Sequence, residues 1–332
     1  MADLKGILVV GELGKEGLAS ITRELLGVAR ELLDVAEGEV NLMLIGEDVS
    51  SYAEEGIAFG ADKVYVVNDV SAQEFPCDFY THAVDQFCRK AGISLCLMGH
   101  TDLGRELAPR AAARLRGCIC MDCVEIRSDV KEKEFVQLRP VFGGKAMAET
   151  ASQRGVIQIV TVRHKSMSGF VHRSDRRGDI IDWSDQLQKG PVRTRLIERK
   201  TEEQEGVNIE NAPIIVAGGG GIGGKEGFEL IRELGRLLKG AVGASRVPVD
   251  EGWVHHNIEI GQTGKIVSPD IYVAVAISGA TQHITGILGS KCIVAVNKDP
   301  DANIFKVSDV GVVADYKELL PYVIEHLRGA SK

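Results

Sequence analysis

The chain has 332 residues, of which 44% are hydrophobic, and this length predicts two domains with sizeable cores. Its 39 Lys and Arg against 47 Asp and Glu give a formal net charge of −8, which argues against nucleic acid or an anionic membrane surface as the main partner. No apolar run has the roughly 18 residues of a membrane span, and no signal or transit peptide is visible. We therefore expect a cytoplasmic protein without membrane insertion.

The first part of the chain alternates apolar runs with amphipathic stretches. Strands are predicted at residues 4–10, 40–45, 62–67, 94–98, 135–141 and 156–162, and helices at residues 18–32, 80–91 and 102–115. Strands that alternate with helices are typical of a parallel sheet. Residues 1–200 are therefore predicted to form an N-terminal α/β domain with a parallel sheet.

Residues 99–115 (GHTDLGRELAPRAAARL) read as a turn followed by a basic helix. A helix N-terminus directly after a strand is suited to bind a phosphate. The interpretation that we favour is structural: Asp102 caps the helix, and the arginines are solvated or contact a partner chain. His100 is likewise expected to be a hydrogen-bonded structural residue and not a catalytic one.

Seven cysteines occur in the chain, at positions 77, 88, 96, 118, 120, 123 and 292. The odd count and the missing secretion signal predict reduced thiols. Cys118, Cys120 and Cys123 form a C-x-C-x-x-C cluster, but no paired Cys or His motif supplies a fourth ligand for a metal. We interpret the three as small apolar core residues and predict no metal site.

A charged stretch with few apolar residues follows, and residues 198–207 are the predicted linker to a second domain at residues 208–330. Strands are predicted there at residues 213–217, 241–244, 271–277, 292–296 and 310–313, and helices at residues 228–238 and 316–327. This alternation predicts a doubly wound, Rossmann-like (DHS-like) α/β domain. Ligands of such domains bind beyond the carboxyl ends of the strands.

Six glycines between Gly218 and Gly224 follow the first strand of this domain. They fit the dinucleotide fingerprint G-x-G-x-x-G in two overlapping registers. The next strand ends in Ser245-Arg246, however, where an NAD site needs an acidic residue for the ribose hydroxyls. An ordinary NAD site is therefore not expected, although the turn could offer its amides to another phosphate ligand.

Three polar turns that contain glycine interrupt the apolar runs, at residues 243–246, 261–265 and 278–283. Glycine allows close backbone approach, and hydroxyl, amide and imidazole groups supply directed hydrogen bonds. Each polar residue alone could be a helix cap, a turn former or a surface charge. Their combination at three strand ends predicts the rim of a ligand site.

In their order and spacing, these motifs resemble the flavin-binding domain of the α subunit of electron-transfer flavoprotein. The resemblance rests on residues 243–246, 249–250, 261–267, 277–280, 282–283, 297–300, 304–305 and 314–315, and it continues more weakly over the N-terminal half. The sequence departs from the family at Gly220, where arginine is usual. The resemblance implies one non-covalently bound FAD in this domain.

The resemblance also implies how the isoalloxazine ring would be held. Gln262 and Thr263 would lie near N5 and O4, Arg246 over or beside the ring, and His283 near O2. These residue types suit the roles, because a flavin needs a donor near N5, donors or positive charge near N1 and O2, and a partner on its face. Lys317, in the last helix, is expected to lie away from the ring.

The rest of the cofactor would contact the other turns. The resemblance implies that Ser245 and residues 278–282 contact the ribityl chain and pyrophosphate, and that Asn297 and Asp315 hold the adenosine. The full set of predicted cofactor-binding residues is Ser245, Arg246, Ile260, Gly261, Gln262, Thr263, Ser278, Gly279, Ala280, Thr281, Gln282, His283, Asn297 and Asp315. No catalytic residue and no metal ligand is predicted.

The function implied by the resemblance is that of an electron carrier without bond-making chemistry of its own, and so not an enzyme. Residues 1–200 would contact the β subunit of a heterodimeric electron-transfer flavoprotein. Electrons would come from acyl-CoA-type dehydrogenases, as in fatty acid β-oxidation, and pass to a quinone-linked oxidoreductase or ferredoxin. Two alternatives stay open: a subunit of an NADH-dependent electron-bifurcating complex, whose β partner carries a second FAD, and a scaffold that has lost its cofactor.

Overall fold

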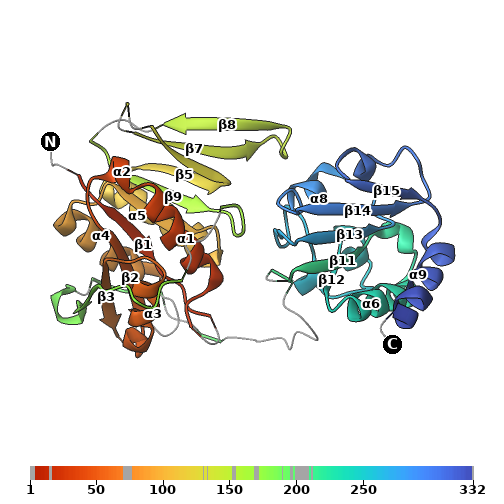
Figure 1. Cartoon of the computed structure of the whole chain (residues 1–332), viewed down its shortest axis with the longest axis horizontal. Helices are drawn as coiled ribbons and strands as arrows, with labels where there is room; N and C mark the ends of the chain where they lie inside the picture. Colours follow the sequence, from red (N-terminus) through yellow and green to blue (C-terminus); the bar gives the residue numbers. More distant parts are fainter. Residues whose placement is uncertain are drawn as a thin grey trace. The chain divides into compact units, whose positions relative to one another are not determined.

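The computed structural model describes residues 4–14, 17–69, 77–129, 131–132, 134–151, 155–167, 172–188, 190–194, 197–198, 209–210 and 212–330. Two compact units are present, one of residues 1–141 and 147–200, the other of residues 142–146 and 201–332 (Figure 1). Most of the predicted linker, residues 199–207, lies outside the described residues. The domain limits at residues 200 and 208 therefore stay a prediction.

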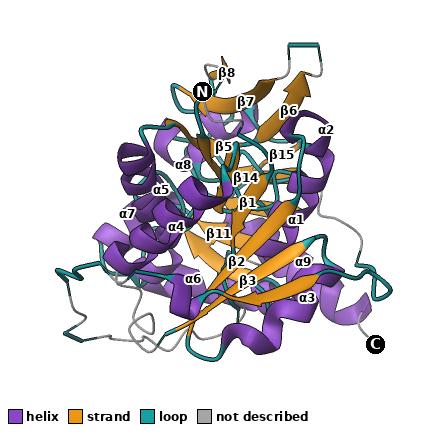
Figure 2. Cartoon of the chain, turned by 90° about the vertical axis from the view of Figure 1, so that its left-hand side faces the viewer, coloured by secondary structure: helices purple, strands orange, loops and turns teal. Residues whose placement is uncertain are grey.

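A parallel sheet in the order β10-β3-β2-β1-β4-β9-β5 forms the centre of the first unit. Figure 2 looks onto this unit, with β1, β2 and β3 side by side. The strands are β1 (Ile7–Val10), β2 (Val40–Gly46), β3 (Lys63–Asn68), β4 (Leu95–Gly99), β5 (Cys118–Cys123), β9 (Gln158–Val162) and β10 (Asp179–Asp182).

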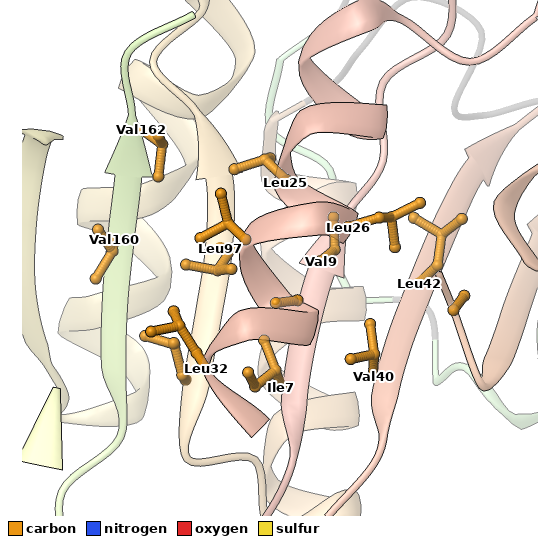
Figure 3. Close-up of a cluster of buried hydrophobic side chains, with 14 of the residues drawn as sticks. Ile7, Val9, Leu25, Leu26, Leu32, Val40, Leu42, Leu97, Val160 and Val162 are labelled. Carbon is orange, nitrogen blue, oxygen red and sulfur yellow. The ribbon is translucent and has the colours of Figure 1, made fainter. Parts of the chain in front are cut away.

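Helices cover both faces of this sheet, because successive strand side chains point to opposite faces. Ile7 and Val9 pack with helix α1 and its neighbours (Figure 3), and Leu8 and Val10 pack with α4 and α5. The helices are α1 (Ser20–Glu31), α2 (Leu33–Ala36) and α3 (Ala53–Ala58) on the first face, and α4 (Cys77–Ala91) and α5 (Asp102–Leu115) on the second.

A three-stranded sheet completes the unit, with strands β6 (Glu125–Asp129), β7 (Glu134–Val141) and β8 (Ala146–Ala151) in sequence order. β6 and β7 pair antiparallel. Ile126 and Phe135 of these strands add their side chains to the core on the α1 face.

The cap of α5 differs from the prediction. Thr101 is the capping residue: its backbone is extended and its hydroxyl accepts from the amide of Gly104 at 3.2 Å. The prediction that Asp102 caps the helix is wrong by one position, because Asp102 already has its place in the first helical turn, where its charge favours the helix dipole. His100 is hydrogen-bonded to Thr161 at 2.9 Å, as expected.

The second unit contains a parallel sheet in the order β12-β11-β13-β14-β15. The strands are β11 (Ile214–Gly218), β12 (Ala241–Ala244), β13 (Ile271–Val275), β14 (Cys292–Asn297) and β15 (Val310–Val313). Because the chain moves outward from β11 in both directions, the strand order reverses between β11 and β13. Such a reversal is where doubly wound sheets bind their ligands.

Apolar clusters lie on both faces of this second sheet. Helices α6 (Phe228–Leu237) and α9 (Tyr316–Ala330) supply Phe228, Ile231, Leu320 and Ile324 to one cluster. The other cluster holds Tyr272 and residues of the connections that follow the strands. The predicted fold class, a parallel-sheet α/β domain followed by a doubly wound one, is confirmed. Among the residues that the structure describes, no helix has both the length and the apolar character to cross a membrane.

Candidate functional site

A cavity of about 330 Å³ lies at the carboxyl ends of the second sheet. Every strand of that sheet is followed by residues that line it. The lining consists of Gly220, Gly221, Ser245, Val247, Ala276, Ser278, Val296, Asn297, Lys298, Asp299, Ala302, Ala314, Asp315, Tyr316 and Lys317. The cavity therefore occupies the edge at which the reversal of strand order predicts a ligand.

Four of the fourteen predicted binding residues line this cavity, namely Ser245, Ser278, Asn297 and Asp315. Asn297 is held in place, since its amide donates to the carbonyl of Ile277 and its oxygen accepts from the amide of residue 299, each at 2.9 Å. Asp315 accepts from the amide of residue 317 at 2.9 Å and so caps α9. Within the described chain, the hydroxyls of Ser245 and Ser278 have no hydrogen-bond partner, which leaves them available to a ligand.

The turn at residues 261–265 packs against the start of helix α8 (Thr281–Thr285) and is a second group of predicted residues. The amide of Gln262 donates to the carbonyl of Gln282 at 2.8 Å. Gly261 has a φ of +148°, and a Cβ there would meet the same carbonyl oxygen at 3.0 Å. The structure thus brings three predicted residues, Gly261, Gln262 and Gln282, side by side, although none of the three lines the cavity.

His283 is buried and has partners on both ring nitrogens. Nδ1 lies 2.9 Å from the carbonyl oxygen of Ile260, and Nε2 lies 3.0 Å from the hydroxyl of Tyr272. Because a carbonyl only accepts, Nδ1 carries the hydrogen and Nε2 accepts from Tyr272. Burial lowers the pKa of His283 to about 4, so the ring is neutral at pH 7. In this arrangement the imidazole joins α8 to Ile260 and to β13.

Thr263 is anchored by a buried carboxylate. Its hydroxyl donates to Glu259 at 2.6 Å, and the second oxygen of Glu259 lies 2.8 Å from Nδ1 of His256. Glu259 is only 3% exposed. The two contacts orient the Thr263 hydroxyl so that its oxygen lone pairs are free.

Arg246 begins helix α7 (Arg246–Asp250) and lies on the surface. Its Nε pairs with Asp250 at 3.0 Å, and the arginine side chain is 66% exposed. Exposed pairs of this kind contribute little stability. The guanidinium can therefore leave Asp250 for a ligand at small cost.

Gly279 shapes the turn that carries Ser278. Its φ is +80°, and a Cβ at this position would overlap the backbone nitrogen of Ile304. The amide of Ile304 in turn donates to the carbonyl of Ser278 at 3.1 Å. Only glycine permits this approach, so the residue acts through the backbone. Three further predicted residues, Ile260, Ala280 and Thr281, lie outside the cavity lining.

Two lysines at the cavity were missing from the predicted set. Lys298 directly follows β14, and Lys317 lies in the first turn of α9 directly after β15. The rule that ligands bind beyond the strand ends would have identified both. Lys317 was expected to lie away from the cofactor ring; because it lines the cavity, it cannot serve as a residue remote from the site.

A doubly wound domain with a polar cavity that contains cations at its switch point is typical of proteins that bind nucleotide cofactors. Comparison with known families agrees. Residues 7–187 match the electron transfer flavoprotein domain, and residues 208–288 match the electron transfer flavoprotein FAD-binding domain.

Similar proteins cover the whole chain. The electron transfer flavoprotein subunit alpha of Thermoanaerobacterium thermosaccharolyticum is 39% identical over 329 residues, which are 99% of each chain. That of Megasphaera elsdenii is 40% identical over 330 residues, 99% of this chain and 98% of the relative. Subunit LctC of a lactate dehydrogenase (NAD(+),ferredoxin) of Acetobacterium woodii is 32% identical over 326 residues, 98% of this chain and 77% of the relative. The chain belongs to the electron transfer flavoprotein α subunit family.

Proposed function

We propose that this chain is the FAD-binding subunit of a heterodimeric electron-transfer flavoprotein. The observation that carries the proposal is the cavity at the switch point of the second sheet, in the domain whose family is described as FAD-binding. The subunit carries electrons and makes no bonds in an organic substrate. The family resemblance supports a β subunit as its obligate partner, contacted through residues 1–200.

The residues around the cavity fit part of a flavin dinucleotide. Lys298 and Lys317 supply positive charge for a pyrophosphate, and the hydroxyls of Ser245 and Ser278 supply hydrogen bonds. A volume of about 330 Å³ is at the low end for ligand sites, so the cavity suits the adenosine and phosphate part and not the whole cofactor. Asn297 and Asp315 are assigned to the adenosine.

The isoalloxazine ring is assigned to the turn at residues 261–263 and to Arg246. When bound, FAD supplies the electron chemistry, and the chain orients the ring and adjusts its charge. Because the Thr263 hydroxyl donates its hydrogen to Glu259, it can only accept a hydrogen bond at the ring edge, and the donor near N5 is assigned to Gln262. The Arg246 guanidinium, released from Asp250, offers a planar cation to the ring face.

The role of His283 follows from its contacts. Because both ring nitrogens are bonded within the protein, we assign it to positioning the turn at Ile260 against α8. A direct contact between His283 and the flavin O2 stays a prediction. The same holds for residues 279–282, whose backbone and exposed side chains are assigned to the ribityl chain and pyrophosphate.

We place the subunit in the cytoplasm, between acyl-CoA-type dehydrogenases of fatty acid β-oxidation and a quinone-linked oxidoreductase or ferredoxin. This assignment rests on the family resemblance. The second candidate is a subunit of an NADH-dependent bifurcating complex. It is favoured by one specific observation, the 32% identity to a subunit of a lactate dehydrogenase (NAD(+),ferredoxin).

The decisive experiment is to purify the chain with its co-expressed β partner and count the FAD released per heterodimer. One FAD, with a second site that holds a nucleotide without flavin, supports the carrier. Two FAD per heterodimer and reduction by NADH support the bifurcating complex. A colourless heterodimer that binds no added FAD would contradict both proposed functions and would favour a scaffold that has lost its cofactor. The double variant Ser245→Ala and Ser278→Ala should weaken FAD binding in either of the first two cases.

A further inference from the structure

Cys120 and Cys123 lie on one face of β5, although a regular strand would place them on opposite faces. Residues three apart alternate across a strand because side chains have a period of two. Here the register with β9 shifts between the two cysteines, and Asp122 has a φ of +60°. Both side chains consequently enter the same core cluster, and each thiol is among the groups that shift the pKa of the other.

The kink that joins the two thiols is held by a network of buried contacts. Arg163 donates to both carboxylate oxygens of Asp122, at 2.9 and 2.7 Å, and Arg163 is only 4% exposed. The backbone amide of Asp122 donates to the hydroxyl of Thr161 at 2.9 Å. A left-handed conformation costs free energy at a residue other than glycine, and bidentate ion pairs are among the contacts strong enough to offset it.

The surroundings make the two thiols unequal. Arg139 of β7 lies beside Cys120, and its Nε has no hydrogen-bond partner in the described part of the chain. The hydroxyl of Thr150 lies 3.4 Å from the sulfur of Cys120. The Cys123 thiol, Thr150 and Arg139 lower the pKa of Cys120 to about 6, whereas Cys120 and burial raise the pKa of Cys123. Cys120 is thus ionised at neutral pH beside a protonated thiol.

We propose that Cys120 and Cys123 form a peroxide-sensitive dithiol that closes to a disulfide. The Cys120 thiolate attacks one oxygen of hydrogen peroxide, which gives a sulfenic acid and releases hydroxide. The Cys123 sulfur then attacks the sulfenic sulfur, and its proton leaves with the sulfenic hydroxyl as water. The two thiols lose two electrons and the peroxide gains them. Cys120 keeps 7% of its surface accessible and Cys123 none, which sets this order of attack.

Cys88 of α4 and Cys96 of β4 provide a control within the same chain. Both lie in one core cluster, and they are 2% and 0% exposed. Burial and the neighbouring thiol raise the pKa of Cys88 well above its ordinary value. The Cys88 thiol therefore stays protonated, and we expect the pair to remain reduced under conditions that oxidise Cys120.

The test uses the full chain, purified with its β partner, treated with hydrogen peroxide and then alkylated under denaturing conditions. Trypsin releases residues 117–127 as one peptide with three cysteines, so the experiment is done in a Cys118→Ser background. We expect this peptide to lose two hydrogens and both alkylation sites before the peptides of Cys88 and Cys96 change. Oxidation of the Cys88 pair first, or no disulfide within residues 117–127, would overturn the proposal.

Two variants separate the attacking thiol from the resolving one. In Cys123→Ser, dimedone should trap a sulfenic acid on Cys120; the absence of an adduct contradicts the assigned order. Arg139→Gln should slow alkylation of Cys120 at pH 6 about fivefold, because a rise of one unit in its pKa leaves about a tenth of the thiol ionised instead of half. Arg236→Gln, a 73% exposed arginine on α6 that leaves the peptide 117–127 intact, is the control and should leave the rate unchanged; equal slowing in both variants rules out a specific role for Arg139.

Discussion

The hydroxyl of Thr263 donates to Glu259 across 2.6 Å, and Glu259 is the buried member of the pair, at 3% exposure. The other oxygen of Glu259 faces His256 at 2.8 Å. A short hydrogen bond to a buried carboxylate fixes the direction of the hydroxyl. The turn at residues 261–265 therefore presents an oriented oxygen, and not a rotating hydroxyl, to any ligand beside it.

Replacing this hydroxyl should affect both folding and binding. Thr263→Val keeps the shape of the side chain but leaves a buried carboxylate oxygen without its donor, which should cost about 1–3 kcal/mol of stability. It should also weaken FAD binding. Thr263→Ser retains the hydroxyl and should stay close to wild type. Urea unfolding and flavin fluorescence titration of the apoprotein measure the two effects. Wild-type behaviour of Thr263→Val in both assays would remove Thr263 from the proposed site.

Arg246 should raise the reduction potential of the bound flavin. A cation at the ring favours the added negative charge, so Arg246→Ala should lower the potential of the first reduction step by about 1 kcal/mol, or ~40 mV for one electron. A spectroelectrochemical titration of the heterodimer measures this shift. Lys291→Ala is the control, because Lys291 is 76% exposed, pairs with Asp270 and precedes β14, whereas the cavity follows that strand. Equal shifts in both variants would contradict the assignment.

An arginine at Gly220 should slow the loss of FAD. A Cβ there would meet Cγ1 of Val247 at 3.0 Å, and Val247 is 52% exposed and so can shift. The added cation would lie at the cavity and could contribute about 1–3 kcal/mol through a charged hydrogen bond. FAD release from Gly220→Arg in mild chaotrope should be slower than from Gly220→Ala, which isolates the steric effect. Release that is unchanged or faster in the arginine variant would mean that the new cation finds no phosphate.

The buried histidine should make the second unit sensitive to acid. The folded pKa of His283 is about 4, below its ordinary value of 6.5, so the unfolded chain takes up this proton first as pH falls. The free energy of unfolding therefore keeps the full contribution of the neutral His283 above pH 6.5. It falls by about 3 kcal/mol in total as the pH drops from 6.5 to 4.

The fluorescence of Trp253, in a Trp183→Phe background, reports urea unfolding of the second unit, because Trp253 is partly buried against its core. In His283→Gln, the free energy of unfolding should change less with pH between 6.5 and 4, although the variant should also be less stable at pH 7. A slope that persists in this variant would assign the effect to another group.

Much of the fold follows from local patterns in the sequence. The strand predicted at residues 310–313 has the same limits as β15, and those at residues 40–45 and 62–67 differ from β2 and β3 by a single residue at one or both ends. β2 is buried along almost its whole length, so its apolar run is continuous and easily recognised, whereas β15 is an exposed edge strand whose apolar run is short. Ser245, Ser278, Asn297 and Asp315, four of the predicted binding residues, line one cavity at the strand ends, and their role in binding stays a prediction.

Only the tertiary structure decided how residues distant in sequence meet. Tyr272 and Ile260 bury His283 and keep its ring neutral, which a sequence pattern cannot indicate. Arg163, the residue directly after the neighbouring strand β9, holds the kink at Asp122, so the two cysteines on either side of it share one face. Burial and charge depend on every group packed around an atom, whereas periodicity depends on neighbours along the chain. The sequence alone therefore determined the elements and the edge of the sheet that carries the cavity, and packing decided which side chains there are free to act.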